Sequence, residues 1–285
     1  RIPENKQTNT SKLQTHVPYN HPQHNYKITK MPAHPTRPES LEHVRDGTLD
    51  PAAAEQLISS LPVDEVANLD LNRVERCGVP EVVLAEGKDT DSLVKIMYSY
   101  VRAAGRVLAS RISPEQVNAV LADLPEGITA DYREICRILI LSDGTVPEPS
   151  GGTVAIVTAG TSDIRVAEEA RAIAEEMGAE VLTAYDVGVA GIHRLFPALE
   201  KLRNADIYIV CAGREGTLPS VVAGLVNKPV IGVPVSTGYG YMGQGEAALA
   251  SMLQSCAAIT VVNIDAGFTA GAVAARTAAL IGGKP

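Results

Sequence analysis

The second half of the chain alternates short apolar runs with helical stretches, and this pattern constrains the fold more than any other feature. Strands are expected at 154–157, 181–183, 207–210, 230–233 and 259–262. Helices are expected at 162–177, 193–203, 218–226, 245–254 and 269–281. Apolar strands joined by helices pair in parallel, and right-handed crossovers cover both faces of the sheet. The sequence therefore predicts an α/β fold with a C-terminal, doubly wound parallel sheet.

The preceding residues predict a smaller α/β domain. Two short helices are expected between Leu41 and about Leu61, with Asp50-Pro51 as the start signal of the second. Further strands are expected at 80–84, 107–109 and 137–141, and further helices at 91–104 and 113–121. Segment 147–152 has two prolines and two glycines in six positions, which is typical of a linker. We therefore expect a tail (1–38), a small α/β N-terminal domain (39–146), the linker (147–152) and a C-terminal domain (153–285).

The tail differs from the rest of the chain in composition. It holds six Lys and Arg against one acidic residue, four of the six histidines and six of the eighteen prolines, without an apolar period. This pattern predicts a disordered basic tail. We expect a cytoplasmic protein, and the alternative is an organelle, if the acid-poor tail is the remnant of a transit peptide. The four cysteines lack metal or disulfide spacing, which favours a reducing compartment.

Charge and hydropathy exclude two classes of partner. The chain has 25 Lys and Arg against 33 Asp and Glu, a formal net charge of −8, which is the wrong sign for a protein that neutralises many phosphates. No apolar run approaches the roughly 20 residues that span a bilayer. We therefore expect a small-molecule ligand, and neither nucleic acid nor a membrane.

Ligands of such sheets bind beyond the carboxyl ends of the strands. The loop after the first strand offers Thr158, Gly160, Thr161, Ser162 and Asp163. Small residues and hydroxyls at the start of a helix suit a phosphate, because backbone N–H groups and the helix dipole point at it. An ordinary glycine turn with an N-cap would look the same, so both readings stay open.

The next two loops carry titratable side chains. Asp186, His193 and Arg194 follow the second strand. Histidine titrates near neutral pH, which suits proton transfer, although a single histidine near a helix start is more often a surface residue. Gly213 and Glu215 follow the third strand. Glu215 is a candidate general base, or it complements the dipole of the next helix.

The last loops add a flexible segment and a cysteine. Residues 236–245 hold four glycines in ten positions and include Ser236 and Gly238, so we expect them to wrap a substrate. Asn263 and Asp265 follow the last strand. Cys256 precedes that strand beside polar residues, so it is less obviously a core residue than the other three cysteines. Its spacing alone does not make it a nucleophile.

Taken in chain order, these loops resemble a known family. The shared motifs are Thr-Ala-Gly-Thr-Ser-Asp (158–163), Gly-Val-Ala-Gly-Ile-His-Arg (188–194), Ala-Gly-x-Glu-Gly-x-Leu-Pro-Ser (212–220), Ser-Cys-Ala (255–257) and Val-Val-Asn-Ile-Asp-x-Gly-Phe (261–268). They resemble the LarB family of nickel-pincer nucleotide biosynthesis, which is related to PurE, the aminoimidazole ribonucleotide (AIR) carboxylases. The resemblance covers about residues 41–283 and includes Leu69-Asp70-x-x-Arg73.

The resemblance implies a carboxylase that acts on nicotinic acid adenine dinucleotide. CO2 or bicarbonate would carboxylate carbon 5 of the pyridinium ring, and hydrolysis of the phosphoanhydride would release AMP. Cys256 would add to the ring and make carbon 5 nucleophilic, and Glu215 would accept the ring proton. The other loop residues named above would bind the nucleotide.

The resemblance also bears on cofactors and assembly. It implies no organic cofactor. Mg²⁺ suits the hydrolytic step, but no carboxylate cluster calls for a metal site. A homo-oligomer is expected, an octamer by resemblance, and the Ala-rich C-terminal helix suits close packing.

Two alternatives stay open at this point. An AIR carboxylase or mutase of purine synthesis would carry a histidine in the loop that holds Glu215, and would give Cys256 no role. A non-catalytic nucleotide-binding module would tolerate the replacement of both residues. The chain also departs from the family pattern in its tail, and in Leu71-Asn72, where two histidines are frequent.

Overall fold

The computed structural model describes residues 37–63 and 66–282, so most of the predicted tail lies outside the described residues. Contacts divide the chain into two units, residues 1–57 and 58–285, which we describe separately. The first unit holds α1 (Arg37–Arg45) and most of α2 (Pro51–Ser59). The carboxylate of Asp50 accepts a hydrogen bond from the Ala52 N–H (3.1 Å), which confirms the predicted start of α2.

The second unit begins with a small mixed sheet. A hairpin of β1 (Ser60–Val63) and β2 (Ala67–Asp70) precedes four strands in the order β3-β4-β6-β5. These are β3 (Val82–Leu84), β4 (Arg106–Ser110), β5 (Thr129–Arg133) and β6 (Ile138–Ser142). The helices are α3 (Arg73–Cys77), α4 (Thr90–Ala104), α5 (Pro114–Ala122) and the short η1 (Glu134–Cys136). The predicted helical pattern up to Leu61 was wrong at its end, because β1 begins at Ser60.

Helix α4 shows why this part folds as predicted. The side chains of Leu93, Ile96, Met97, Tyr100 and Val101 recur at helical spacing and are all buried. Asp89 caps the helix start, since its side chain accepts a hydrogen bond from the Ser92 N–H (2.9 Å). The sequence missed β1, β2, α3 and β5, which are short elements without a clear apolar period.

The C-terminal sheet confirms the predicted fold class. Its five strands are all parallel, in the order β11-β10-β9-β7-β8. They are β7 (Thr153–Thr158), β8 (Glu180–Ala184), β9 (Ile207–Ala212), β10 (Val230–Pro234) and β11 (Thr260–Val261). The helices are α6 (Ile164–Glu176), α7 (Leu195–Lys201), α8 (Leu218–Ala223), α9 (Glu246–Leu253) and α10 (Gly267–Ile281), with 3₁₀ turns η2 (Thr161–Asp163) and η3 (Val189–Arg194). The helix predicted at 193–203 is therefore a 3₁₀ turn followed by the shorter α7.

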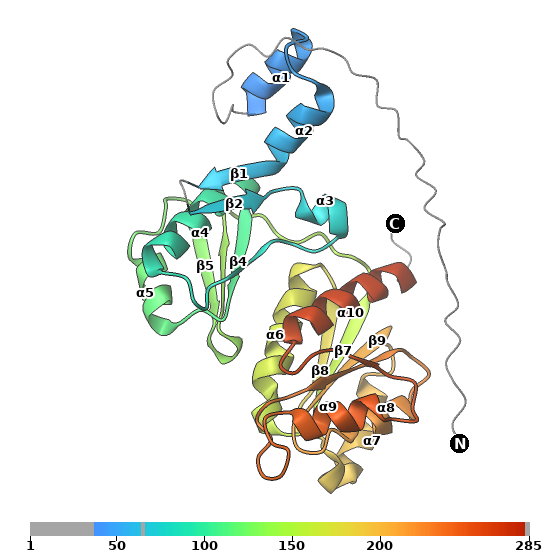
Figure 1. Cartoon of the computed structure of the whole chain (residues 1–285). Coiled ribbons are helices and arrows are strands. Elements are labelled where there is room, and N and C mark those ends of the chain that lie inside the picture. Colours follow the sequence, from blue (N-terminus) through green and yellow to red (C-terminus); the bar gives the residue numbers. More distant parts are fainter. Residues whose placement is uncertain (1–36, 64–65, 283–285) are drawn as a thin grey trace, which may run out of the picture. The chain divides into compact units, whose positions relative to one another are not determined.

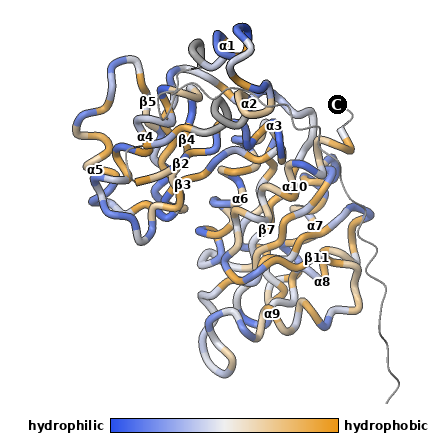
Figure 2. Tube along the Cα trace, turned by 45° about the horizontal axis from the view of Figure 1, so that its top comes forward, coloured by the Kyte–Doolittle hydropathy of each residue, from blue (hydrophilic) through white to orange (hydrophobic). Residues whose placement is uncertain are grey.

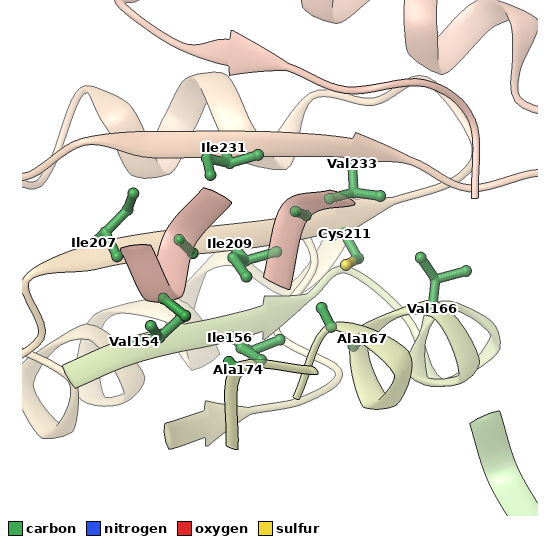
Figure 3. Close-up of a cluster of buried hydrophobic side chains, with 14 of the residues drawn as sticks. Val154, Ile156, Val166, Ala167, Ala174, Ile207, Ile209, Cys211, Ile231 and Val233 are labelled. Carbon is green, nitrogen blue, oxygen red and sulfur yellow. The ribbon is translucent and has the colours of Figure 1, made fainter. Parts of the chain in front are cut away.

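Helices cover both faces of this sheet. Helices α6 and α10 pack on one face, and α7, α8 and α9 pack on the other (Figure 1). Side chains of β7, β9 and β10, including Ile156, Ile209 and Val233, fill the core beneath α6 and α10 (Figure 3). Hydrophobic and hydrophilic residues alternate along the helices (Figure 2), as expected for helices that bury one side.

The strand order creates a crevice at one edge of the sheet. From β7 the chain passes to β8 on one side, whereas β9, β10 and β11 are added on the other. The loops after β7 and β9 therefore separate at the carboxyl ends of these two neighbouring strands. Ligands of open α/β sheets bind at this topological switch point, so the fold itself indicates where to look for a site.

Candidate active site

A cavity of about 460 Å³ lies at the switch point. Its volume falls within the roughly 300–1,000 Å³ of small-molecule sites. The lining residues are 159–160, 162–163, 188–190, 212–218 and 237–239. These segments follow β7, β8, β9 and β10, so the cavity brings together six of the predicted site residues: Gly160, Ser162, Asp163, Gly213, Glu215 and Gly238.

Asp163 is the buried carboxyl group of the cavity. It is 3% exposed, accepts a hydrogen bond from the Gly160 N–H (2.8 Å), and lies 3.5 Å from the hydroxyl of Thr237. Burial raises the pKa of Asp163, although the Gly160 N–H and the Thr237 hydroxyl act in the opposite direction. Asp163 can therefore hold a proton more readily than an exposed aspartate, and it fixes the loop that follows β7.

Glycines let the loop after β9 pass close to its neighbours. A Cβ on Gly213 would lie 3.1 Å from the Asp163 carboxylate and 3.2 Å from the Thr237 hydroxyl. Gly216 has φ +65°, and a Cβ there would lie 2.6 Å from the Ala248 carbonyl oxygen at the start of α9. Glu215 lies between these two contacts and is exposed on the cavity wall. Its carboxylate is thus presented to a ligand by a tightly fixed backbone.

Two residues that the sequence analysis did not single out also line the cavity. The guanidinium carbon of Arg214 lies 4.3 Å from the ring centroid of Tyr239. This distance is that of a cation–π contact between the loop after β9 and the glycine-rich loop after β10. Both residues belong to predicted loops, but no sequence pattern says that their side chains meet.

The structure places several predicted residues outside the cavity lining. Thr158 is fully buried, and its hydroxyl oxygen accepts a hydrogen bond from the Asp186 N–H (3.0 Å). Asp186 forms an ion pair with Arg194 (2.6 Å). His193 and Thr161 are exposed and do not line the cavity. These five residues shape or flank the loops.

The end of β11 forms a second group. Ser236 donates its backbone N–H to the Asp265 carboxylate (2.9 Å), and Arg165 pairs with the same carboxylate (3.2 Å). Asp265 lines a separate cavity of about 370 Å³ together with Arg73. Asn263 accepts a hydrogen bond from the Ile264 N–H beside it (2.8 Å). Asp265 therefore anchors the glycine-rich loop instead of lining the larger cavity.

Cys256 lies apart from Glu215. It is exposed in the bend between α9 and β11, at the amino end of the strand, and it does not line the cavity. The bend is held by Ser255, whose hydroxyl contacts the Ser220 hydroxyl (2.7 Å) and accepts a hydrogen bond from the Ala257 N–H (3.0 Å). In contrast, Cys211 is fully buried, as predicted for a core cysteine (Figure 3).

Among the described residues, neither a metal-ligating cluster nor a membrane-spanning helix is found. Within residues 37–63 and 66–282, no group of three or more His, Cys, Asp or Glu side chains could hold a metal ion. None of the helices described for this chain is long and apolar enough to cross a membrane.

Comparison with known proteins identifies the family. Residues 62–143 match the model of the LarB/PurE-like N-terminal domain, and residues 153–283 match that of AIR carboxylase. An uncharacterized protein of Methanocaldococcus jannaschii is 45% identical over 226 residues, which cover 77% of this chain and 86% of that protein. The N5-carboxyaminoimidazole ribonucleotide mutase of the same organism is 38% identical over 132 residues, or 45% of this chain and 79% of the mutase.

These matches first define a class, the proteins with an AIR carboxylase domain. More particularly, the chain belongs to the LarB-like family related to PurE, in which a LarB/PurE-like N-terminal domain precedes that domain. The matches support a carboxylase-like role of the LarB and PurE kind.

Proposed function

We propose that the protein carboxylates the pyridinium ring of nicotinic acid adenine dinucleotide at carbon 5 and hydrolyses its phosphoanhydride. The observation that supports this most is Glu215 on the wall of a cavity at the switch point, in the loop that would carry a histidine in a purine-pathway carboxylase. In the loop after β7, the Ser162 side chain lines the cavity at the start of the helical segment that leads into α6, where its hydroxyl would donate to a phosphate. Glu215, which lines the cavity, would accept the ring proton.

The covalent step begins at Cys256. The Cys256 thiolate adds to the ring carbon beside the nitrogen, which moves an electron pair onto the ring and makes carbon 5 nucleophilic. Carbon 5 then attacks CO2 and forms a carbon–carbon bond. Glu215 accepts the proton from carbon 5, the thiolate leaves, and the ring becomes aromatic again. Water attacks the phosphoanhydride in a separate step and releases AMP. Mg²⁺ would assist this hydrolysis.

In this proposal the cysteine reaches the cavity from a second copy of the chain. The cavity lies at the carboxyl ends of the strands, whereas Cys256 lies at the amino end of β11. Helix α9 separates the two ends, and its eight residues rise about 12 Å. Cys256 is also exposed, as a residue donated to a neighbour must be before assembly. A homo-oligomer, an octamer by resemblance to the family, would complete the site.

The reaction is tested by mass spectrometry. Purified protein is incubated with nicotinic acid adenine dinucleotide, bicarbonate and Mg²⁺, beside the Cys256→Ala and Glu215→Gln variants. We expect AMP and a dicarboxylated mononucleotide from the wild type, and neither product at a comparable rate from the variants. Turnover of aminoimidazole ribonucleotide instead would favour the purine-pathway alternative. Product formation that survives Cys256→Ala would contradict the covalent mechanism.

The second copy is tested by mixing the two inactive variants. If each site takes Glu215 from one copy and Cys256 from another, random mixed oligomers contain both groups in about one quarter of their sites. Activity should then return on mixing after dissociation and reassembly. If both groups act within one copy, every site keeps one defect and the mixture stays inactive.

A further inference from the structure

Arg214 carries an unneutralised charge into the candidate site. Arg214 is the only positively charged residue among those that line the cavity. The same lining contains two carboxyl groups, those of Asp163 and Glu215. None of the ion pairs found among the described residues involves it. An arginine held at a binding cavity without a protein carboxylate is available to an anionic group of the ligand.

The structure also holds this arginine in place. A Cβ on Gly238 would lie 3.5 Å from the backbone nitrogen and Cα of Arg214, so the two loops are in close contact. The Tyr239 ring, 78% exposed, lies under the guanidinium at 4.3 Å. An aromatic face positions a guanidinium without neutralising it. Arg214 is thus ordered at the cavity wall while its hydrogen-bond donors stay free for a ligand.

We propose that Arg214 binds the ring carboxylate of the nicotinate and makes the site specific for the acid over the corresponding amide. This inference depends on the proposed function. Glu215 and Arg214 are consecutive residues with opposite charges. The ring also presents two positions: carbon 5, which loses a proton, and carbon 3, which carries the carboxylate. Glu215 would contact the first and Arg214 the second. The diphosphate would have a separate donor in the Ser162 hydroxyl, which lines the cavity in the loop after β7.

Calorimetric titration of the full chain, without bicarbonate, tests this assignment. The ligands are nicotinic acid adenine dinucleotide and nicotinamide adenine dinucleotide, which differ only at the ring substituent. We expect the wild type to bind the acid roughly 10- to 100-fold more tightly, the range of a charge-assisted bidentate contact. Arg214→Met should remove this preference by weakening the acid only. Arg214→Lys should keep part of it, because lysine retains the charge but not the planar fork.

Tyr239 provides matched variants. Tyr239→Phe keeps the ring under the guanidinium and should keep the preference, whereas Tyr239→Leu should reduce it several-fold. Arg214→Met with an unchanged preference would overturn the inference and leave the carboxylase proposal intact. Equal weakening of both ligands would also overturn it, because the guanidinium would then contact the shared diphosphate. A wild type that binds neither dinucleotide would overturn the proposed function together with this inference.

Discussion

Helix α10 packs closely on α6, and the substitution Gly271→Ala tests this contact. Helix propensity and steric contact predict opposite effects of this substitution on stability. Gly271 lies in the second turn of α10, inside the helix, where glycine costs about 1 kcal/mol relative to alanine. By helix propensity alone, Gly271→Ala should therefore stabilise the protein. However, a Cβ on Gly271 would lie 2.4 Å from the Ala170 carbonyl oxygen of α6, closer than real Cβ atoms come. Gly267, one turn earlier, makes the same kind of contact with the Val166 carbonyl oxygen.

The steric cost should exceed the gain in propensity. Overpacking costs about 1–3 kcal/mol, and the upper end applies because the Ala170 carbonyl belongs to a helix that is itself packed on the sheet. Subtracting the propensity gain leaves a net loss of about 2 kcal/mol, or about 4–8 °C in Tm for a unit of this size. Urea unfolding followed by circular dichroism would measure it. Gly224→Ala is the matched control, because a Cβ there meets no atom closer than 3.5 Å. If Gly271→Ala is as stable as Gly224→Ala, the close approach of α6 and α10 is wrong.

Three further predictions concern charge and thiols. Arg106→Met should lower the free energy of unfolding, measured in urea, by about 3 kcal/mol, because it leaves the buried Glu176 side chain (3% exposed) without its guanidinium partner at 2.5 Å. An Arg106→Lys variant that loses as much stability would contradict the ion pair. Because the pKa of Asp163 is raised in the folded protein, the wild type should lose stability as the pH rises from the ordinary aspartate value of 3.8 to that raised pKa. Asp163→Asn cannot ionise, so its stability relative to the wild type should increase over the same pH range. Thermal melts at a series of pH values would measure this, and a stability difference that does not change with pH would refute it. Iodoacetamide should label the exposed Cys256 before Cys211, whose pKa is raised by complete burial, and peptide mapping that finds the reverse order would refute it.

The sequence predicted the C-terminal sheet well because of how its strands are buried. Parallel strands covered on both faces read as unbroken apolar runs, and β7, β9 and β10 are such runs. The N-terminal strands were harder to find. Strand β5 reads Thr-Ala-Asp-Tyr-Arg at the edge of its sheet and has three exposed residues, so it shows no apolar period. Strand β1 contains Pro62, which argues against a strand in the sequence alone.

The sequence could likewise predict some parts of the candidate site and not others. Its loops could be predicted, because the carboxyl ends of parallel strands meet at one edge whatever the side chains are. The contact between Arg214 and Tyr239 could not, because it depends on how two loops fold over each other. The separation of Cys256 from Glu215 is implicit in the chain order, since one residue precedes its strand and the other follows one. That Cys256 does not line the cavity of its own copy became clear only once the sheet order and the cavity were known.

Helix α6 links the cavity to the N-terminal sheet. It begins directly after Asp163, which fixes the loop at the cavity, and it ends at Glu176. Near that end, Glu175 pairs with Arg133 of β5 (2.6 Å) and Glu176 pairs with Arg106 of β4. Between these two ends, α6 is contacted by α10, where Gly267 and Gly271 lie against the carbonyl oxygens of Val166 and Ala170. The strands β4 and β5 are thus joined by ion pairs to the helix that begins at the cavity, although none of their residues lines the cavity.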